Sequence, residues 1–150
     1  GDDIIYTTGG FNGGFDSIVS GNDGNDIIYN NSGDAILYGN DGDDIIYTGA
    51  GADCPYGGNG ADKFVLAKNM GSGNRGNITY LPDFEKGVDK LLLTDDLTFS
   101  DLTITTGDAI SCSGNGFSDK TLIFIVDSGA KYLVSLDLSI TLDSNDFVTE

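Results

Sequence analysis

Residues 21–65 read GNDGNDIIY, NNSGDAILY, GNDGDDIIY, TGAGADCPY and GGNGADKFV, five units of nine residues that follow one another without a gap. Every unit has glycine at its fourth place, and four of the five have aspartate at the sixth. The eighth place is apolar, and the ninth is tyrosine in four units and valine in the last. Units that cannot bury a core alone do so by stacking on one another, so this period predicts a solenoid.

The composition of each unit changes after its sixth place. Glycine, asparagine and aspartate fill most of the first six places, where they tolerate a positive φ and let the backbone turn tightly. The last three places favour a short strand. Residues 1–6 match places four to nine, and residues 11–19 are a looser copy. Because side chains alternate along a strand, the eighth-place residues are expected to form the core: Ile5, Ile18, Ile28, Leu37, Ile46 and Phe64.

Aspartate dominates the acidic residues. It supplies 22 of the 24, and the first 62 residues contain eleven aspartates but no lysine or arginine. Short carboxylates among 23 glycines favour the ligation of a hard cation by tightly turning backbone. The net charge of −17 argues against a nucleic-acid partner. The chain has no run of about 18 apolar residues, which argues against a membrane-spanning segment.

The units resemble the RTX, or haemolysin-type, calcium-binding nonapeptide G-G-x-G-x-D-x-U-x. This resemblance implies an all-β fold, a parallel β-roll in which each nonapeptide forms half a coil and calcium ions lie between the turns of repeats two apart. It places Asp3, Asp26, Asp44 and Asp62 in one column, and Asp16 and Asp53 in a second. The implied calcium ligands are these six carboxylates and the turn residues Gly24, Gly42 and Gly60 with their neighbours Asp23, Asp41 and Asn59.

The second column departs from the pattern. Ala35 lacks the carboxylate, although Asp34 beside it can substitute in part, and Asn30 with Asn31 replaces the glycine pair. Pro55 stands where an inward aliphatic side chain belongs, and proline removes a strand donor. We expect the second column to bind fewer or looser ions than the first.

Seventh and ninth places should face away from the core, yet they carry apolar and aromatic residues. The pairs are Ile4 with Tyr6, Ile27 with Tyr29, Ile36 with Tyr38 and Ile45 with Tyr47. One interpretation is β-propensity with packing between like neighbours on adjacent strands. The other is a contact surface, for the C-terminal region or for self-association.

Glycine becomes rarer after Val65, and the sequence predicts strands in NITYL, DKLLL, DLTITT, TLIFIV and KYLVSLDL, with a hairpin at DSGA 127–130. The segments PDFEKGVDKLLL, LTFSDLTI and LDSNDFV resemble the end region of serralysin-type proteins. We therefore predict a β-roll over residues 1–65 and a β-rich C-terminal cap over 66–150, which covers unpaired backbone at the end of the coil. The family resemblance also implies a signal for type I secretion in this region.

Function is expected to be non-catalytic. The chain has no histidine, which excludes a His-based zinc site or a Ser-His-Asp arrangement within it. Of two alternatives for Cys54 and Cys112, a disulfide or two thiols, we favour thiols. The sequence opens within a repeat, so we expect a fragment or a processed product. The predicted function is an extracellular module that folds on calcium and serves as a structural, adhesive or self-assembling surface component. The alternative is the export and folding tail of a larger secreted enzyme.

Overall fold

The computed structural model describes residues 1–8, 17–68, 70, 79–110, 117–126, 130–137 and 140–150. Over these residues the chain is all-β apart from two 3-10 helices, η1 (Phe99–Asp101) and η2 (Ser144–Asp146). No helix in these ranges is long and apolar enough to cross a membrane. The strands are β1 (Ile4–Thr7), β2 (Ser17–Asp23), β3 (Ile27–Ser32), β4 (Ala35–Asp41), β5 (Ile45–Ala50), β6 (Cys54–Asn59), β7 (Lys63–Leu66), β8 (Thr79–Tyr80), β9 (Lys90–Leu93), β10 (Leu102–Ile110), β11 (Phe117–Val126), β12 (Ala130–Asp137) and β13 (Phe147–Thr149).

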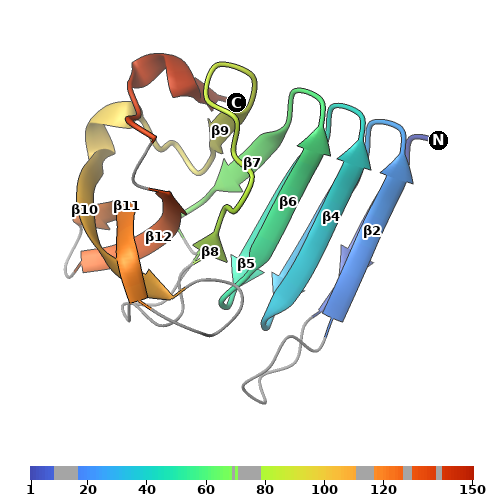
Figure 1. Ribbon diagram of the computed structural model, residues 1–150, viewed down its shortest axis with the longest axis horizontal. Coiled ribbons are helices and arrows are strands. Elements are labelled where there is room, and N and C mark those ends of the chain that lie inside the picture. The colour runs from blue at the N-terminus through green and yellow to red at the C-terminus, as the bar shows by residue number, and fades with distance from the viewer. Residues whose placement is uncertain (9–16, 69, 71–78, 111–116, 127–129, 138–139) are drawn as a thin grey trace.

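The strands of the repeats alternate between two parallel sheets. β1, β3, β5 and β7 lie in one sheet, while β2, β4 and β6 form the other (Figure 1). Within the repeats, the pairing joins residues 18 apart, such as Ile27 with Ile45 and Ile36 with Cys54. Each nonapeptide therefore contributes half a coil, which confirms the predicted parallel β-roll.

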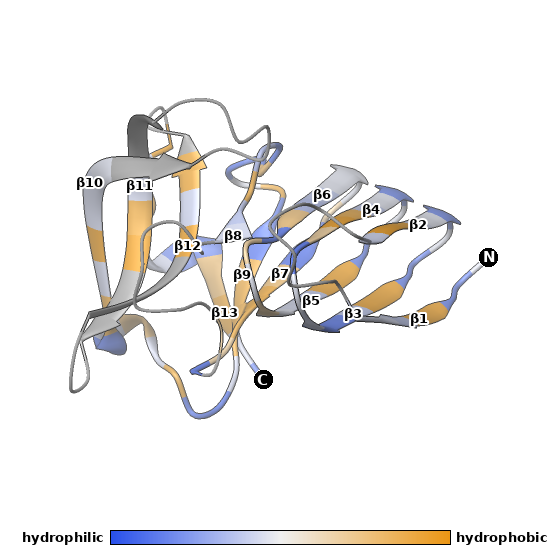
Figure 2. Ribbon diagram, turned by 90° about the horizontal axis from the view of Figure 1, so that it is seen from below, coloured by the Kyte–Doolittle hydropathy of each residue, from blue (hydrophilic) through white to orange (hydrophobic). Residues whose placement is uncertain are grey.

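Eighth-place side chains fill the space between the two sheets. Ile28, Leu37 and Ile46 have no exposed surface, and Phe64 is 2% exposed. Figure 2 shows the two layers with apolar stretches on the strands of both. Burying a side chain of this size contributes about 1.5–3 kcal/mol, so each coil adds to a continuous core that no single unit provides.

One predicted core residue is wrong. Ile18 is 71% exposed, and Val19 packs against the core instead. The reason is the register of β2, which pairs Ser17 with Ala35 and Val19 with Leu37. A shift of one residue moves a side chain to the opposite face of the sheet, so the looser copy at residues 11–19 is displaced by one place from the regular repeat.

The first sheet continues beyond the repeats. β9 pairs with β7, and β13 pairs with β9, both in parallel, to give the order β1-β3-β5-β7-β9-β13. Leu91 and Leu93 of β9 are buried in the same core cluster as Phe64. The sheet therefore crosses the predicted boundary at residues 65 and 66 without a break, and the division into two parts stays a prediction.

The remaining strands form a second region at the end of the roll. β10, β11, β12 and β8 make a four-stranded sheet, in which β10–β11 and β11–β12 are antiparallel. The predicted pairing of the last two strands is thus confirmed, although their connection at 127–129 lies outside the described residues. β8 joins this sheet to the roll, because the backbone N–H of Tyr80 donates to the carbonyl of Asp53 at 2.9 Å.

Two expectations for β6 can be compared with the structure. Cys54 is disulfide-bonded, so our preference for free thiols was wrong for this residue. The other cysteine of the chain, Cys112, lies outside the described residues. Pro55 is buried opposite Leu37, and it is accommodated because β6 is the last strand of its three-stranded sheet.

Candidate metal site

The sixth-place aspartates of alternate repeats form one column along the edge of the roll. Asp3, Asp26, Asp44 and Asp62 each come directly before a strand of the six-stranded sheet, and the pairing of those strands stacks the four residues. Asp26, Asp44 and Asp62 have no exposed surface, while Asp3 at the open end is exposed. The structure thus brings together the first predicted column.

One carboxylate oxygen of each aspartate supports the neighbouring turn. Oδ1 of Asp26 accepts a hydrogen bond from the backbone N–H of Asp3 at 2.7 Å. Oδ1 of Asp44 accepts from Asp26 at 2.7 Å, and Oδ1 of Asp62 accepts from Asp44 at 2.9 Å. These turn amides lie outside the strand ladders, so the aspartates satisfy donors that the sheets leave unpaired.

The other carboxylate oxygen has no partner. Oδ2 of Asp26, Asp44, Asp53 and Asp62 is buried and accepts no hydrogen bond within the described part of the chain. A buried carboxylate oxygen without a donor or a cation is costly, because it has lost its hydration. No lysine or arginine precedes residue 63, and Lys63 is exposed, so the repeats bury no basic side chain that would compensate these charges. A bound cation would supply what is missing.

The pKa values of the carboxyl groups reflect this cost. Burial raises the pKa of Asp53 and of Asp62 to about 7 in the absence of a cation, against the lowering effect of their hydrogen bonds. Burial also raises the pKa of Asp44, and the charge of Asp26 adds to the increase. A proton and a cation therefore compete for the same oxygens.

Backbone carbonyls of the fourth-place glycines face the next turn. Gly24, Gly42 and Gly60 have φ angles of 126°, 134° and 139°, which L side chains rarely adopt. A Cβ on Gly42 would lie 2.1 Å from the carbonyl oxygen of Gly24, and one on Gly60 would lie 2.0 Å from that of Gly42. Glycine is therefore required for the close stacking of the turns, and the role of these carbonyls as ligands stays a prediction.

The three predicted neighbours occupy the outer side of the turns. Asp23, Asp41 and Asn59 are in register and exposed, and the Asn59 amide donates to Oδ1 of Asp41 at 2.8 Å. The carbonyl of Asp41 accepts from the Gly24 N–H at 2.8 Å, and that of Asn59 accepts from Gly42 at 2.9 Å. Their side chains point away from the buried column, and their role as ligands stays a prediction.

Fifth-place residues have a structural role that the sequence reasoning missed. Oδ1 of Asn25 accepts from the backbone N–H of Asp43 at 2.8 Å, and Oδ1 of Asp43 accepts from that of Ala61 at 2.9 Å. The fifth-place side chains accept from N–H groups of the following coil, whereas the sixth-place aspartates accept from N–H groups of the preceding coil. The two sets of side chains together hold each turn from both sides. The recurrence of Asn or Asp at the fifth place is the signal that would have revealed them.

The first column also continues beyond the repeats. Oδ1 of Asp89, before β9, accepts from the backbone N–H of Asp62 at 3.0 Å, and its Oδ2 accepts from that of Glu85 at 2.7 Å. Asp83 accepts from Gly57 and Gly58 at 3.2 and 3.1 Å. The sequence reasoning missed both residues. The signal for Asp89 is the likeness of GVDKLLL (87–93) to GADKFVL (60–66).

The second column contains one buried carboxylate among the described residues. Asp53 has no exposed surface, and its Oδ1 accepts from the backbone N–H of Ala35 at 2.9 Å. Asp16 lies outside the described residues, so its predicted place in this column is not tested. The structure therefore places Asp53 and Ala35 together as expected. This pair of stacked turns has one sixth-place carboxylate, whereas each pair in the first column has two.

These donor atoms suit a hard cation. Among the described residues, no three carboxylate or cysteine side chains converge on one point, so an ion here must draw much of its coordination from backbone carbonyls. Calcium accepts six to eight oxygen ligands in flexible geometry, with carboxylates and carbonyls mixed. The unpartnered Oδ2 atoms, the turn carbonyls that face the next coil and the lack of lysine or arginine before residue 63 all fit calcium.

Outside the columns, the ninth-place tyrosines form stacked ladders. The rings of Tyr6 and Tyr29 are 4.9 Å apart, those of Tyr29 and Tyr47 are 4.4 Å apart, and those of Tyr38 and Tyr56 are 4.9 Å apart on the other sheet. Neighbours of this kind stabilise a sheet by about 0.5–1.5 kcal/mol a pair. The ladders thus pack on themselves, which supports the packing interpretation and leaves their outer edges available for contacts.

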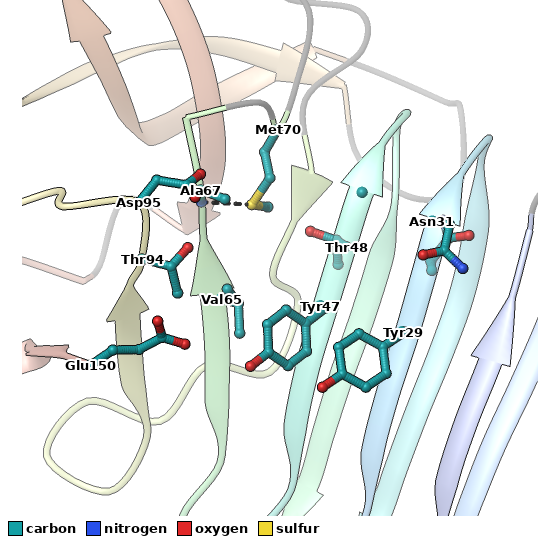
Figure 3. Close-up of a pocket in the computed structure, with 12 residues that line it drawn as sticks. Tyr29, Asn31, Tyr47, Thr48, Val65, Ala67, Met70, Thr94, Asp95 and Glu150 are labelled. Carbon is teal, nitrogen blue, oxygen red and sulfur yellow. Dashed lines mark hydrogen bonds between the residues drawn. The ribbon is translucent and has the colours of Figure 1, made fainter.

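A pocket of about 360 Å³ lies where the first ladder ends (Figure 3). In the ladder, Val65 takes the place of a fourth ring beside Tyr47, and the pocket extends over it to Met70, Asp95 and Glu150. Burial raises the pKa of Tyr47, and the charge of Glu150 adds to the increase. Asn30 and Thr48, two buried residues of the second column, also line this pocket.

Comparison with known proteins agrees with the geometry. Residues 29–64 match the RTX calcium-binding nonapeptide repeat in four copies. No curated protein sequence gives a match. Among solved structures, the AlgE6R3 subunit of the Azotobacter vinelandii mannuronan C5-epimerase is similar in fold, with a TM-score of 0.58 and 23% identity over 93% of this chain and 82% of that one. The serralysin likeness of the end region stays a prediction.

Proposed function

Since residues 29–64 carry RTX nonapeptide repeats, which bind calcium, we propose that this chain is an extracellular, non-catalytic module whose β-roll folds when calcium enters the aspartate columns. The observation that carries the proposal is the set of four buried Oδ2 atoms without a partner at Asp26, Asp44, Asp53 and Asp62. Folding without a cation would bury these charges uncompensated. Folding around calcium turns the oxygens of the first column, at Asp26, Asp44 and Asp62, into ligands.

The cell exterior is the compartment in which this mechanism works. Extracellular calcium modules bind with dissociation constants of about 10⁻⁴–10⁻³ M, a concentration range that is met outside cells. Inside the cell, the low calcium concentration would leave eleven aspartates unneutralised in the first 62 residues, and the glycine-rich repeats would stay unfolded. An unfolded chain suits type I secretion, which we include in the proposal.

We further propose that the module is a structural or adhesive surface component. The outer Ile and Tyr ladders are the contact surface, and apolar side chains are most exposed on the first strands of the two sheets. Ile4 is 62% exposed, Tyr6 68% and Ile18 71%. Exposed apolar groups on the first strands of both sheets favour contacts with another protein surface, including a second copy of this chain.

Sedimentation velocity tests both parts of the proposal. In chelator, the chain should sediment slowly as an expanded monomer, and in millimolar calcium it should become compact and associate. Replacing Tyr29, Tyr38 and Tyr47 with serine should abolish the association and leave the compaction. If calcium causes no compaction, calcium-driven folding is wrong. If the serine variant associates like the natural chain, the ladders are not the contact surface.

A second candidate is the export and folding tail of a larger secreted enzyme. The observation that favours it is the fold shared with a subunit of a mannuronan C5-epimerase. The complete open reading frame distinguishes the two candidates, because a catalytic domain upstream of Gly1 favours the tail. Electron microscopy of the calcium-loaded chain gives an independent criterion, since filaments or layers favour the structural component.

A further inference from the structure

The two columns of turns differ at their first as well as their sixth places. In the first column, the first place is always glycine, at Gly21, Gly39 and Gly57. In the second column, the first-place residues among the described coils are Asn30 and Thr48, both buried. The sixth places of these two units are Ala35 and Asp53.

The first-place glycines make room for the aspartates. A Cβ on Gly21, Gly39 or Gly57 would lie 2.1 Å from Oδ2 of Asp26, Asp44 or Asp62, the sixth-place residue of the same unit. In these three units a side chain at the first place would therefore collide with the carboxylate, whereas the unit at residues 48–56 of the second column accommodates both Thr48 and Asp53. The unit at residues 30–38 reverses the arrangement, with a polar side chain at the first place and alanine at the sixth.

Asn30 uses the space that this reversal creates. It is 2% exposed, and its Nδ2 donates to the carbonyl oxygen of Gly33 and to Oδ1 of Asp53, both at 2.8 Å. Gly33 is a fourth-place glycine, the position whose carbonyls face the next turn in the first column. Both neighbours are acceptors, so the amide nitrogen, rather than the oxygen, must face them.

The amide thus joins a carboxylate of one turn to a carbonyl of the preceding turn. In the first column, these are the kinds of oxygen that would share a cation. We infer that the Asn30 amide takes the place of a calcium ion between the turns at residues 30–35 and 48–53. This inference rests on the proposed function, since it presumes that the first column binds calcium.

The consequence is a roll with two different edges. The first edge, with Asp26, Asp44 and Asp62, is completed by calcium. On the second edge, the Asn30 amide joins the turns before β4 and β6 by hydrogen bonds that need no ion. Asn30 is a positioning residue, because it holds Asp53 in place without contacting an ion.

Calcium stoichiometry measured by native mass spectrometry tests this inference. The variant N30G/A35D restores glycine at the first place and aspartate at the sixth, and it should bind one calcium ion more than the natural chain. The matched control is N31G/A61D, which makes the same two types of change at exposed positions of the repeats. The control should bind the same number of ions as the natural chain.

The outcomes distinguish a failure of this inference from a failure of the proposed function. If the natural chain binds no calcium at all, the proposed function is wrong. If the natural chain binds calcium and N30G/A35D binds the same number of ions, the gap already holds an ion and the inference fails. If N30G/A35D does not fold, NMR of the natural chain in saturating calcium tests the inference instead. There, the Asn30 side-chain amide protons should exchange slowly with solvent, and rapid exchange would contradict the inference.

Discussion

Asp43 and Asp44 are adjacent, and they lie in opposite surroundings. Asp44 is fully buried with an unpartnered Oδ2, whereas Asp43 is exposed and accepts a hydrogen bond from Ala61. The fifth place tolerates asparagine, as Asn25 shows, because its task is to accept one hydrogen bond. The sixth place needs a carboxylate, because a cation requires its charge as well.

Replacing Asp44 with asparagine should therefore weaken calcium binding strongly. Asparagine can still accept the hydrogen bond from Asp26 through its oxygen, but it lacks the charge. A charged partner contributes about 1.5–3 kcal/mol, so we expect the calcium concentration at half-folding to rise about 10- to 100-fold. A calcium titration followed by circular dichroism measures this midpoint.

Asp43→Asn provides the control for that titration, since it removes the same charge one residue away. Its midpoint should stay within about threefold of that of the natural chain, because the exposed carboxylate is screened by solvent. Equal effects of the two substitutions would show that net charge, rather than the buried column, determines calcium binding.

The raised pKa values predict how the metal-free chain responds to pH. Burial raises the pKa of Asp53 and Asp62 to about 7 in the folded state, above about 3.9 for an unfolded aspartate. The folded state therefore binds more protons, so the contribution of these groups to stability is full below about pH 4 and is lost as the pH rises to about 7. The strand signal of the desalted, metal-free chain should be larger at pH 4.5 than at pH 8. A signal that grows with pH would contradict the assignment.

Among the elements, the strands of the regular repeats could be predicted from the sequence and the irregular ones only in part. Places seven to nine determine β3 to β7, because their period is unbroken. β2 keeps the regular spacing, with Val19 opposite Leu37, 18 residues later. The prediction of Ile18 as a core residue is wrong because the loose copy at residues 11–19 ends one residue too early to be in phase with Gly21. β9 was predicted as a strand, but its membership of the roll was not, because Asp89 follows Asp62 by 27 residues instead of 18.

The metal site could likewise be predicted from the sequence only in part. The column of Asp26, Asp44 and Asp62 follows from spacing alone, since stacking preserves the phase. The contact of Asn30 with Asp53 does not, because it depends on the rotamer of a side chain 23 residues away. The disulfide of Cys54 was not expected either, since two cysteines in different parts of the sequence give no measure of their separation.

Asp89 provides a test of how β9 is joined to the roll. Both of its carboxylate oxygens accept backbone N–H groups, from Asp62 and Glu85. In Asp89→Asn, one of these N–H groups would face an amide nitrogen, at a cost of about 1–3 kcal/mol. The calcium-loaded variant should melt roughly 2–10 °C lower in a calorimetric scan.

Asp96→Asn is the matched control for this measurement. Asp96 is exposed and has a φ of 57°, a conformation that asparagine tolerates. Its melting temperature should stay unchanged. If Asp89→Asn melts at the temperature of the natural chain, then Asp89 does not tie β9 to the repeats.

For the whole molecule, the central feature is the balance between a continuous core and a set of uncompensated charges. The core cluster runs from Ile28 through Phe64 to Phe147, so repeats and end region share apolar contacts. Against it stands a net charge of −17, with buried carboxylates along one edge. Calcium removes the opposing term, and we therefore expect binding and folding to be a single process.

Far-UV circular dichroism at pH 7.5, recorded together with calcium uptake on the same sample, tests this claim most directly. In excess chelator the spectrum should be that of a coil, and the strand signal should rise in proportion to the calcium bound. A strand spectrum in excess chelator, or calcium uptake without a change in the spectrum, would contradict the account.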